Sequence, residues 1–159
     1  MQYSSAREFF EAAREAARDA ERIRRQLLSM EQRTLSLGGS GFDPRVRSTP
    51  DPERMSTRII AGIDVTERLQ ARQEEDYRLI DSACEVLYGE DNRSGLYAMV
   101  GWPADAIYHH YLALRTWEQT ADILGYSERH TYEMVRAALD RASKCGDIMT
   151  RIGCGHTSE

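Results

Sequence analysis

The sequence predicts an all-α protein in which a long antiparallel helical hairpin, similar to a coiled coil, is followed by a compact three-helix domain. Three observations support this fold class. A long segment has no glycine or proline and carries apolar residues at helical spacing, a second such segment follows a Gly/Pro-rich break, and closely spaced helix start and stop signals come after Gly101. The expected organisation is a hairpin over residues 1–90 with a linker at about 37–52, a domain over 91–146, and a flexible tail over 147–159.

The first helix is expected from Ser4 to Leu37. Its apolar residues alternate at spacings of four and three, which is typical of a helix that packs against another helix. They are Phe9, Ala13, Ala16, Ala20, Ile23, Leu27 and Met30. We interpret it as a structural or dimerising helix, and the alternative is that Arg22, Arg24 and Arg25 contact phosphate.

The linker at 37–52 is rich in glycine and proline, so it is expected to be a flexible loop. A second helix is predicted from Asp51 as cap and Pro52 as first helical residue to about Tyr88. Its drifting apolar stripe consists of Met55, Ile59, Ile63, Leu69, Tyr77, Ile80, Cys84 and Leu87. The middle of the stripe is polar around Thr66, Gln70 and Gln73. We therefore expect an antiparallel pair whose seam is weaker at its centre than at its ends.

A turn at Gly89–Gly95, a short helix at Leu96–Val100 and a break at Gly101 follow. Trp102-Pro103 then opens a helix with one continuous buried face. That face consists of Ala104, Ile107, Tyr108, Tyr111 and Leu112. His109 and His110 are adjacent and diverge by about 100° on a helix, so we interpret them as surface and half-buried residues and not as metal ligands.

The segment from Thr116 to Arg141 carries the clearest local signals. Thr116 and Gln119 form a capping box that starts a helix, and Gly125 suits the left-handed residue just past its end. Trp117, Ala121 and Leu124 are expected to face inward. Ser127 caps the next helix, which is expected to run to about Ala142. Two short helices joined this tightly are typical of a helix-turn-helix.

The helix after Ser127 is expected to have two faces. Its inward residues are Thr131, Met134, Val135 and Ala138. Its outward residues are the candidate DNA-binding residues, namely Ser127 as cap, Glu128, Arg129, His130, Tyr132, Glu133 and Arg136. A recognition helix presents such side chains near its amino-terminal end, where arginine can bind guanine or phosphate and glutamate can accept from cytosine. The alternative reading of the same pattern is plain helical packing.

The segment also resembles a known family. Tyr111-Leu112, Arg115 to Glu118, Ala121 to Ser127 and Tyr132 to Leu139 look like the helix-turn-helix of sigma-factor region 4. The likeness is closest to phage and prophage late-operon transcriptional regulators of the RinA and ArpU type. It covers roughly Asp81 to Gly146. The resemblance implies double-stranded promoter or late-operon DNA as target and RNA polymerase as a candidate partner. Thr120 departs from the family, which usually has Ile or Val there.

The charge distribution limits how a nucleic acid would be bound. The formal net charge is −5, and the stretch Ile59–Asp91 alone has nine acidic residues against three arginines. The remainder of the chain is close to neutral, which allows a local DNA-contacting face but excludes a generally basic binder. The acidic stretch is also a candidate surface for a protein partner.

Other chemistries find little support in the sequence. The widely spaced Cys84, Cys145 and Cys154 fit no disulfide framework, and Cys145, Cys154 and His156 lack zinc-site spacing. The carboxylates Glu74, Glu75, Asp76 and Asp81 are interpreted as a solvated face. No catalytic motif, cofactor loop, bilayer-spanning run or signal segment is recognised, so we expect a non-enzymatic, cytoplasmic protein without metal or cofactor.

The leading interpretation is a sequence-specific DNA-binding transcription regulator of phage or prophage type. It is expected to act as a homodimer or with RNA polymerase, because one recognition helix seldom supplies enough contact. The alternative is a helical adaptor or a packaging oligomer similar to a small terminase subunit. A third reading is an antagonist that binds RNA polymerase without touching DNA.

Overall fold

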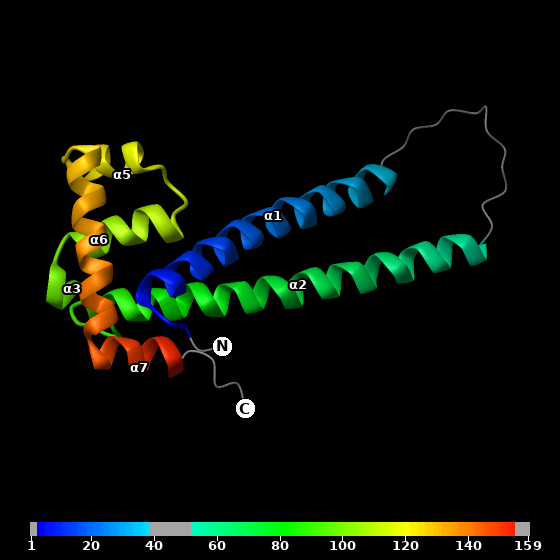
Figure 1. Ribbon diagram of the computed structural model, residues 1–159. Helices are drawn as coiled ribbons and strands as arrows, with labels where there is room; N and C mark the ends of the chain where they lie inside the picture. Colours follow the sequence, from blue (N-terminus) through cyan, green and yellow to red (C-terminus); the bar gives the residue numbers. More distant parts are fainter. Residues whose placement is uncertain (1–2, 39–51, 155–159) are drawn as a thin grey trace. The chain divides into compact units, whose positions relative to one another are not determined.

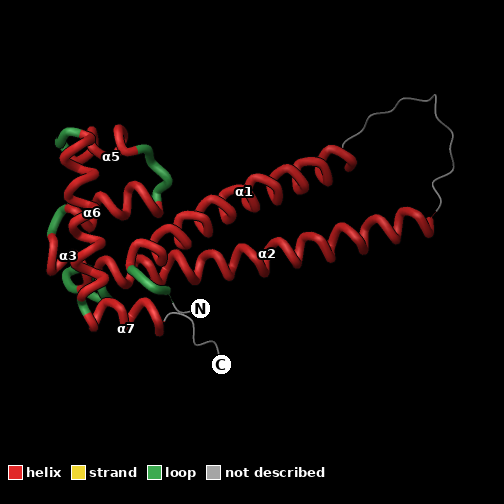
Figure 2. The backbone as a smooth tube through the Cα atoms, viewed as in Figure 1, coloured by secondary structure: helices red, strands yellow, loops and turns green. Residues whose placement is uncertain are grey.

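The computed structural model describes residues 3–38 and 52–154, and every regular element in these two ranges is a helix (Figures 1 and 2). The predicted all-α class is therefore confirmed. The chain divides into two compact units. The core unit comprises Met1–Asp19 and Asp76–Glu159, and the hairpin unit comprises Ala20–Glu75. The predicted linker at 37–52 lies almost entirely outside the described residues, as does Asp51.

Helix α1 (Ala6–Gly38) has the seam that its spacing predicts. Phe9, Ala13, Ala16, Ala20 and Ile23 are buried, whereas Leu27 and Met30 are only half-buried. Phe10 is also buried because it lies beside Phe9 on the broad face that enters the core unit. The seam thus becomes progressively more exposed toward the carboxyl end of α1.

Helix α2 (Pro52–Tyr88) begins with the expected proline and ends at the expected tyrosine. The predicted stripe is wrong in part, because Ile59, Ile63 and Tyr77 are exposed and, among the stripe residues whose side chains are described, only Leu87 is fully buried. The expectation that the outer end of the seam packs better than its middle is also wrong. Residues spaced by four drift about 40° per step around a helix, so the stripe leaves the side that faces α1. The polar middle remains in the seam, where the Nε2 of Gln73 donates to the carbonyl of Ala20 at 3.3 Å.

In the core unit, α2 is followed by a turn and by α3 (Gly95–Val100). Asp91 accepts hydrogen bonds from the amides of Arg93 and Ser94 in this turn. A Cβ on Gly95 would lie 2.7 Å from the carbonyl oxygen of Val86, and its φ is +70°, so only glycine fits this position. The glycine allows α3 to return onto the end of α2.

Helix α4 (Pro103–Ile107) continues into a π-helical turn, η1 (Tyr108–Leu112). Ala104, Ile107, Tyr111 and Leu112 are buried as predicted, but Tyr108 is exposed. The wider π turn changes the angular spacing of the side chains, so the regular α-helical period does not hold here. It also turns His110 inward, so the expectation of a surface or half-buried residue is wrong for His110, which is buried, while His109 is half-buried.

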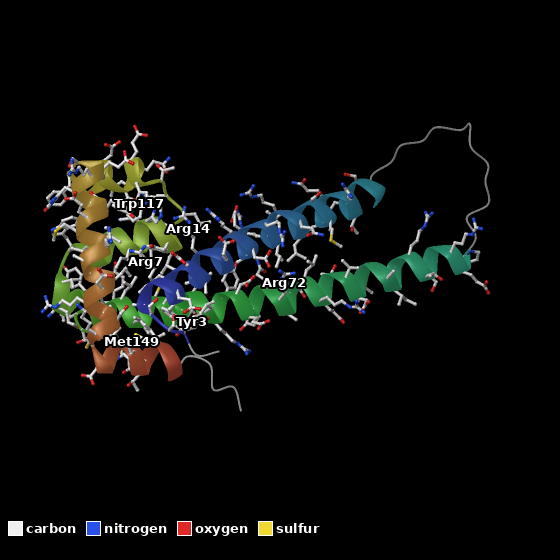
Figure 3. The ribbon with its side chains drawn as sticks, viewed as in Figure 1. Tyr3, Arg7, Arg14, Arg72, Trp117 and Met149 are labelled. Atoms are coloured by element: carbon white, nitrogen blue, oxygen red, sulfur yellow. The ribbon has the colours of Figure 1, made fainter. Side chains whose placement is uncertain are left out.

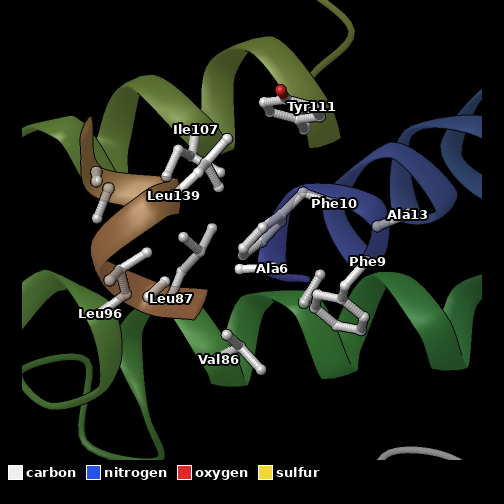
Figure 4. Packing of buried hydrophobic residues seen from close by; sticks show 14 of the residues in the cluster. Ala6, Phe9, Phe10, Ala13, Val86, Leu87, Leu96, Ile107, Tyr111 and Leu139 are labelled. Carbon is white, nitrogen blue, oxygen red and sulfur yellow. The ribbon is translucent and has the colours of Figure 1, made fainter. Parts of the chain in front are cut away.

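Helices α5 (Trp117–Leu124), α6 (Glu128–Lys144) and α7 (Gly146–Cys154) complete the core unit. The flexible tail expected from residue 147 is corrected, because residues 147–154 lie in α7 and Ile148 and Ile152 are buried in the core. These two residues are four apart and pack as one apolar helix face. Figure 4 shows how Phe9 and Phe10 of α1, Leu87 of α2, Ile107 of α4 and Leu139 of α6 meet in the same cluster.

Candidate nucleic-acid interface

The amino end of α5 is fixed by the predicted capping box. The amide of Gln119 donates to Oγ1 of Thr116 at 3.2 Å, and the amide of Thr116 donates to Oε1 of Gln119 at 3.0 Å. Two amides that the first helical turn leaves without helical partners are therefore satisfied. This fixes the point at which α5 begins.

The turn between α5 and α6 also follows the sequence prediction. Gly125 has φ 76° and ψ 28°, the left-handed conformation, and the amide of Tyr126 donates to the carbonyl of Ala121 at 3.1 Å. Ser127 then caps α6, with Oγ accepting from the amide of His130 at 3.3 Å. The chain thus reverses between two short helices over three residues, which is a tight and well-specified connection.

Helix α6 has one buried and one exposed face. Its buried residues include Thr131, Val135, Ala138 and Leu139, and the predicted inward residue Met134 is half-buried. All seven candidate residues are exposed, namely Ser127, Glu128, Arg129, His130, Tyr132, Glu133 and Arg136. The sequence therefore predicted correctly which side of this helix is exposed, and the role of these residues in binding DNA stays a prediction.

Four of these residues form a stripe along the outward side of α6. Arg129, Tyr132, Glu133 and Arg136 are separated by three, four and seven positions, so they share one side of the helix. Nε of Arg129 lies 3.0 Å from Oε1 of Glu133, and the arginine side chain is 89% exposed. Such an exposed ion pair contributes at most about 1 kcal/mol, so a ligand can separate it at small cost.

His130 lies apart from this stripe, beside two aromatic rings. Trp102 and Tyr126 stack with centroids 4.2 Å apart, and the imidazole of His130 lies 5.7 Å and 5.6 Å from the two rings. Sequence reasoning treated Trp102 only as the residue that precedes a helix. Nothing in the local sequence connects it with Tyr126, because 24 positions separate the two residues.

A chain of ring contacts connects Tyr132 to α1. Tyr132 meets Trp117 edge to face at 5.3 Å, and Trp117 stacks on His110 at 3.6 Å. The guanidinium of Arg14, on α1, donates to Nε2 of His110. Arg14 and Trp117 are labelled in Figure 3. Burial, followed by the positive charge of Arg14, lowers the pKa of His110 to about 4, which keeps the imidazole neutral near pH 7.

The electrostatics of the surface are nearly balanced. From Thr116 to Lys144 the chain has five acidic residues and four basic ones. This segment therefore lacks the excess of positive charge that drives non-specific binding to the phosphate backbone. Hydrogen bonds from individual side chains would have to supply most of any selectivity.

The residues considered for other chemistry are dispersed. Within the described ranges, no group of three or more His, Cys, Asp or Glu is arranged to hold a metal ion. Cys84 and Cys145 are half-buried free thiols, and burial raises the pKa of Cys84. His156 and the side chain of Cys154 lie outside what is described. None of the helices within residues 3–38 and 52–154 has the length and apolarity needed to cross a bilayer.

Comparison of the chain with protein-family models, with curated proteins and with solved structures found no match. The features of this chain that bear on function are therefore the geometry of α5 and α6 and the residues that they expose.

Proposed function

We propose that this chain is a sequence-specific DNA-binding transcription regulator in which α5 and α6 form a helix-turn-helix and α6 is the recognition helix. The observation that carries the proposal is the division of α6 into two faces. Val135, Ala138 and Leu139 anchor it in the core unit, while the predicted contact residues remain exposed. A helix held this way can enter a major groove without rearrangement of its own unit.

The stripe on α6 suggests a division of roles. Arg129, in the first turn, can donate both guanidinium arms to O6 and N7 of a guanine. Glu133, one turn later, can accept from N4 of a cytosine, and in the free protein it holds the guanidinium of Arg129 in place. Arg136 lies a further turn along, where a phosphate is the expected contact.

The resemblance to sigma-factor region 4 and to regulators of the RinA and ArpU type supports the same assignment. Under it, the target is promoter or late-operon DNA and RNA polymerase is a candidate partner for the acidic stretch Ile59–Asp91. Such a regulator would act in the cytoplasm. The near-neutral surface implies weak binding to random DNA and a larger share of affinity from base contacts.

The test is a selection from random duplex DNA with the full chain, followed by binding titrations on the selected sequence at several salt concentrations. Arg129→Ala is expected to weaken binding by about 10- to 100-fold and to relax preference at one base pair, because it removes a bidentate base contact. Arg136→Ala is expected to weaken binding to all sequences and to reduce the salt slope by about 1.

Arg141→Ala is the matched control, because Arg141 is exposed on the same helix but about 120° around it from Arg129. It is expected to leave affinity nearly unchanged. Failure to enrich any sequence at low salt would contradict the proposal. Equal effects of all three substitutions would contradict the assignment of α6 as the reading element.

A second candidate is a helical scaffold or packaging oligomer similar to a small terminase subunit. It is favoured by the exposed isoleucines of α2, which suit an assembly surface. Light scattering separates the two candidates, because a closed ring of many copies is expected for the scaffold and not for a regulator.

A further inference from the structure

The hairpin unit exposes a group of large aliphatic side chains on both of its helices. Ile59, Ile60 and Ile63 of α2 are 58%, 63% and 55% exposed, and Leu28 and Leu35 of α1 are 44% and 70% exposed. We define these five residues as the apolar patch. Single exposed aliphatic residues are common on soluble proteins, but five large ones near the ends of two neighbouring helices favour an interaction surface.

The helical register places the five residues together. Leu28 and Leu35 are seven positions apart and lie about 100° around α1 from the seam. The three isoleucines lie to one side of Gly62, Thr66 and Gln73, the half-buried positions that face α1. For two antiparallel helices, these rotations bring both sets to the same flank. The hydrogen bond from Gln73 to Ala20 sets the register, and residues 28–35 lie level with residues 58–65.

At the same end of the hairpin unit, α1 and α2 do not cover each other's side chains. Every described side chain in residues 31–36 and 52–61 is exposed, and the two helices separate toward these ends (Figure 1). The outer ends of α1 and α2 therefore bury little apolar surface against each other, and their aliphatic side chains are available to a further apolar surface.

We infer that a second copy of the chain covers the apolar patch, so that two hairpin units form a four-helix bundle about a two-fold axis. Charge supports a second copy as the occupant. Over Ala20–Gly38, α1 has four arginines and two glutamates, whereas α2 over Pro52–Glu75 has five acidic residues and four arginines. When the two-fold axis runs along the helices, α1 of each copy meets α2 of the other, so opposite net charges meet twice.

The exposed apolar area of the patch is large enough for an interface between two copies of the chain. The exposed parts of the five side chains amount to about three whole aliphatic residues per copy, and two copies would bury on the order of 1,000 Å², the lower limit for a specific interface. The interface is independent of the proposed DNA face, which lies in the core unit.

The experiment measures the mass of the full chain in solution without DNA, by light scattering and sedimentation over a range of concentrations. The wild-type protein is expected at twice the chain mass of 18.2 kDa. The triple variant Ile59→Gln, Ile60→Gln, Ile63→Gln is expected to be a monomer, with a dimer dissociation constant raised by at least about 100-fold. Glutamine is a good helix former, so helicity by circular dichroism should be retained in residues that stay packed.

Val65→Gln is the matched control, because Val65 is an exposed aliphatic residue of the same helix, turned 120° or more away from the three isoleucines. It is expected to leave the dimer intact. A wild-type monomer at high micromolar concentration, a larger ring, or a triple variant that remains dimeric would each overturn the inference.

Hydrogen exchange of the unmodified chain provides a test that does not depend on any variant folding. Amides of residues 56–66 are expected to exchange roughly tenfold faster when the protein is diluted below its dissociation constant. Exchange that does not depend on concentration would overturn the inference. Because DNA is absent from all of these measurements, a failure here is distinct from a failure of the DNA-binding proposal.

Discussion

Among single residues, His110 shows how packing changes the properties of a side chain. It is 8% exposed, it stacks on Trp117 from α5, and it accepts a hydrogen bond from Arg14 of α1. The groups around it are cationic or apolar, with Arg14 and Arg18 both disfavouring a second positive charge. The folded protein therefore favours the neutral form of the imidazole. Through its contacts with Arg14 and Trp117, this imidazole connects α1 to the helices that present the candidate interface.

This environment makes stability depend on pH. The pKa of His110 is lowered from 6.5 to about 4 in the folded state, so between these values the unfolded chain binds more protons. The stabilisation is complete above about pH 6.5 and is lost as pH falls toward 4, by about 3 kcal/mol in total. Urea titrations of wild type and His110→Gln at several pH values measure it. The variant should show a smaller decrease over this range, and parallel curves would contradict the assignment.

At the scale of elements, the connection between α5 and α6 is specified by local chemistry. The capping box at Thr116, the left-handed Gly125 and the Ser127 cap all act within a few residues of the turn. Each contributes modestly, but together they set the end of one helix and the beginning of the next. The direction of the exposed stripe on α6 follows from these boundaries.

Two glycine substitutions are expected to change the free energy of unfolding in opposite directions, and one of them, Gly125→Ala, tests the connection between α5 and α6. Gly125→Ala is expected to lower the free energy of unfolding by about 1 to 2 kcal/mol, because a Cβ is disfavoured at φ 76°. A Cβ there would meet no atom within 4 Å, so the cost comes from the backbone alone.

Gly62→Ala is the control, because Gly62 lies within α2 and a Cβ there also meets nothing within 4 Å. It should stabilise by up to about 1 kcal/mol through helix propensity. Thermal and chemical unfolding of both variants measure the difference. If both substitutions changed the free energy of unfolding in the same direction, Gly125 would not be held in the left-handed conformation at this turn.

At the scale of the whole molecule, the core unit combines segments from both ends of the chain. Phe9 and Phe10 near the amino terminus pack in the same cluster as Ile148 and Ile152 near the carboxyl terminus. The amide of Ala6 also donates to Oγ of Ser143 at 3.0 Å. Helix α6 is therefore supported by α1 and α7, neither of which belongs to the segment that carries the helix-turn-helix signals.

The contribution of α7 can be measured directly. Ile152→Ala is expected to lower the free energy of unfolding by about 2 to 4 kcal/mol, because it leaves a cavity in a buried cluster. Arg151→Ala, next to it and exposed, should change stability by less than about 0.5 kcal/mol. Denaturant unfolding gives both values. Equal, negligible effects would mean that α7 contributes nothing to the core.

The sequence alone determined the features that depend on neighbouring residues. Helical periodicity indicated α1 and both faces of α6, and capping residues with Gly125 located the turn, because these interactions span no more than four or five positions. The exposure of all seven candidate residues was predicted this way, since exposure on a well-capped helix follows from its period.

Tertiary packing alone decided which distant segments meet. It placed Trp102 against Tyr126, Arg14 against His110, and Ile152 in the core, and it left Ile59 and Ile63 exposed. An apolar residue at helical spacing has the same local signal whether its partner is the same chain, another copy or absent. Which surface covers it depends on the free energy of burial over the whole fold, and that cannot be read from a window of neighbouring residues.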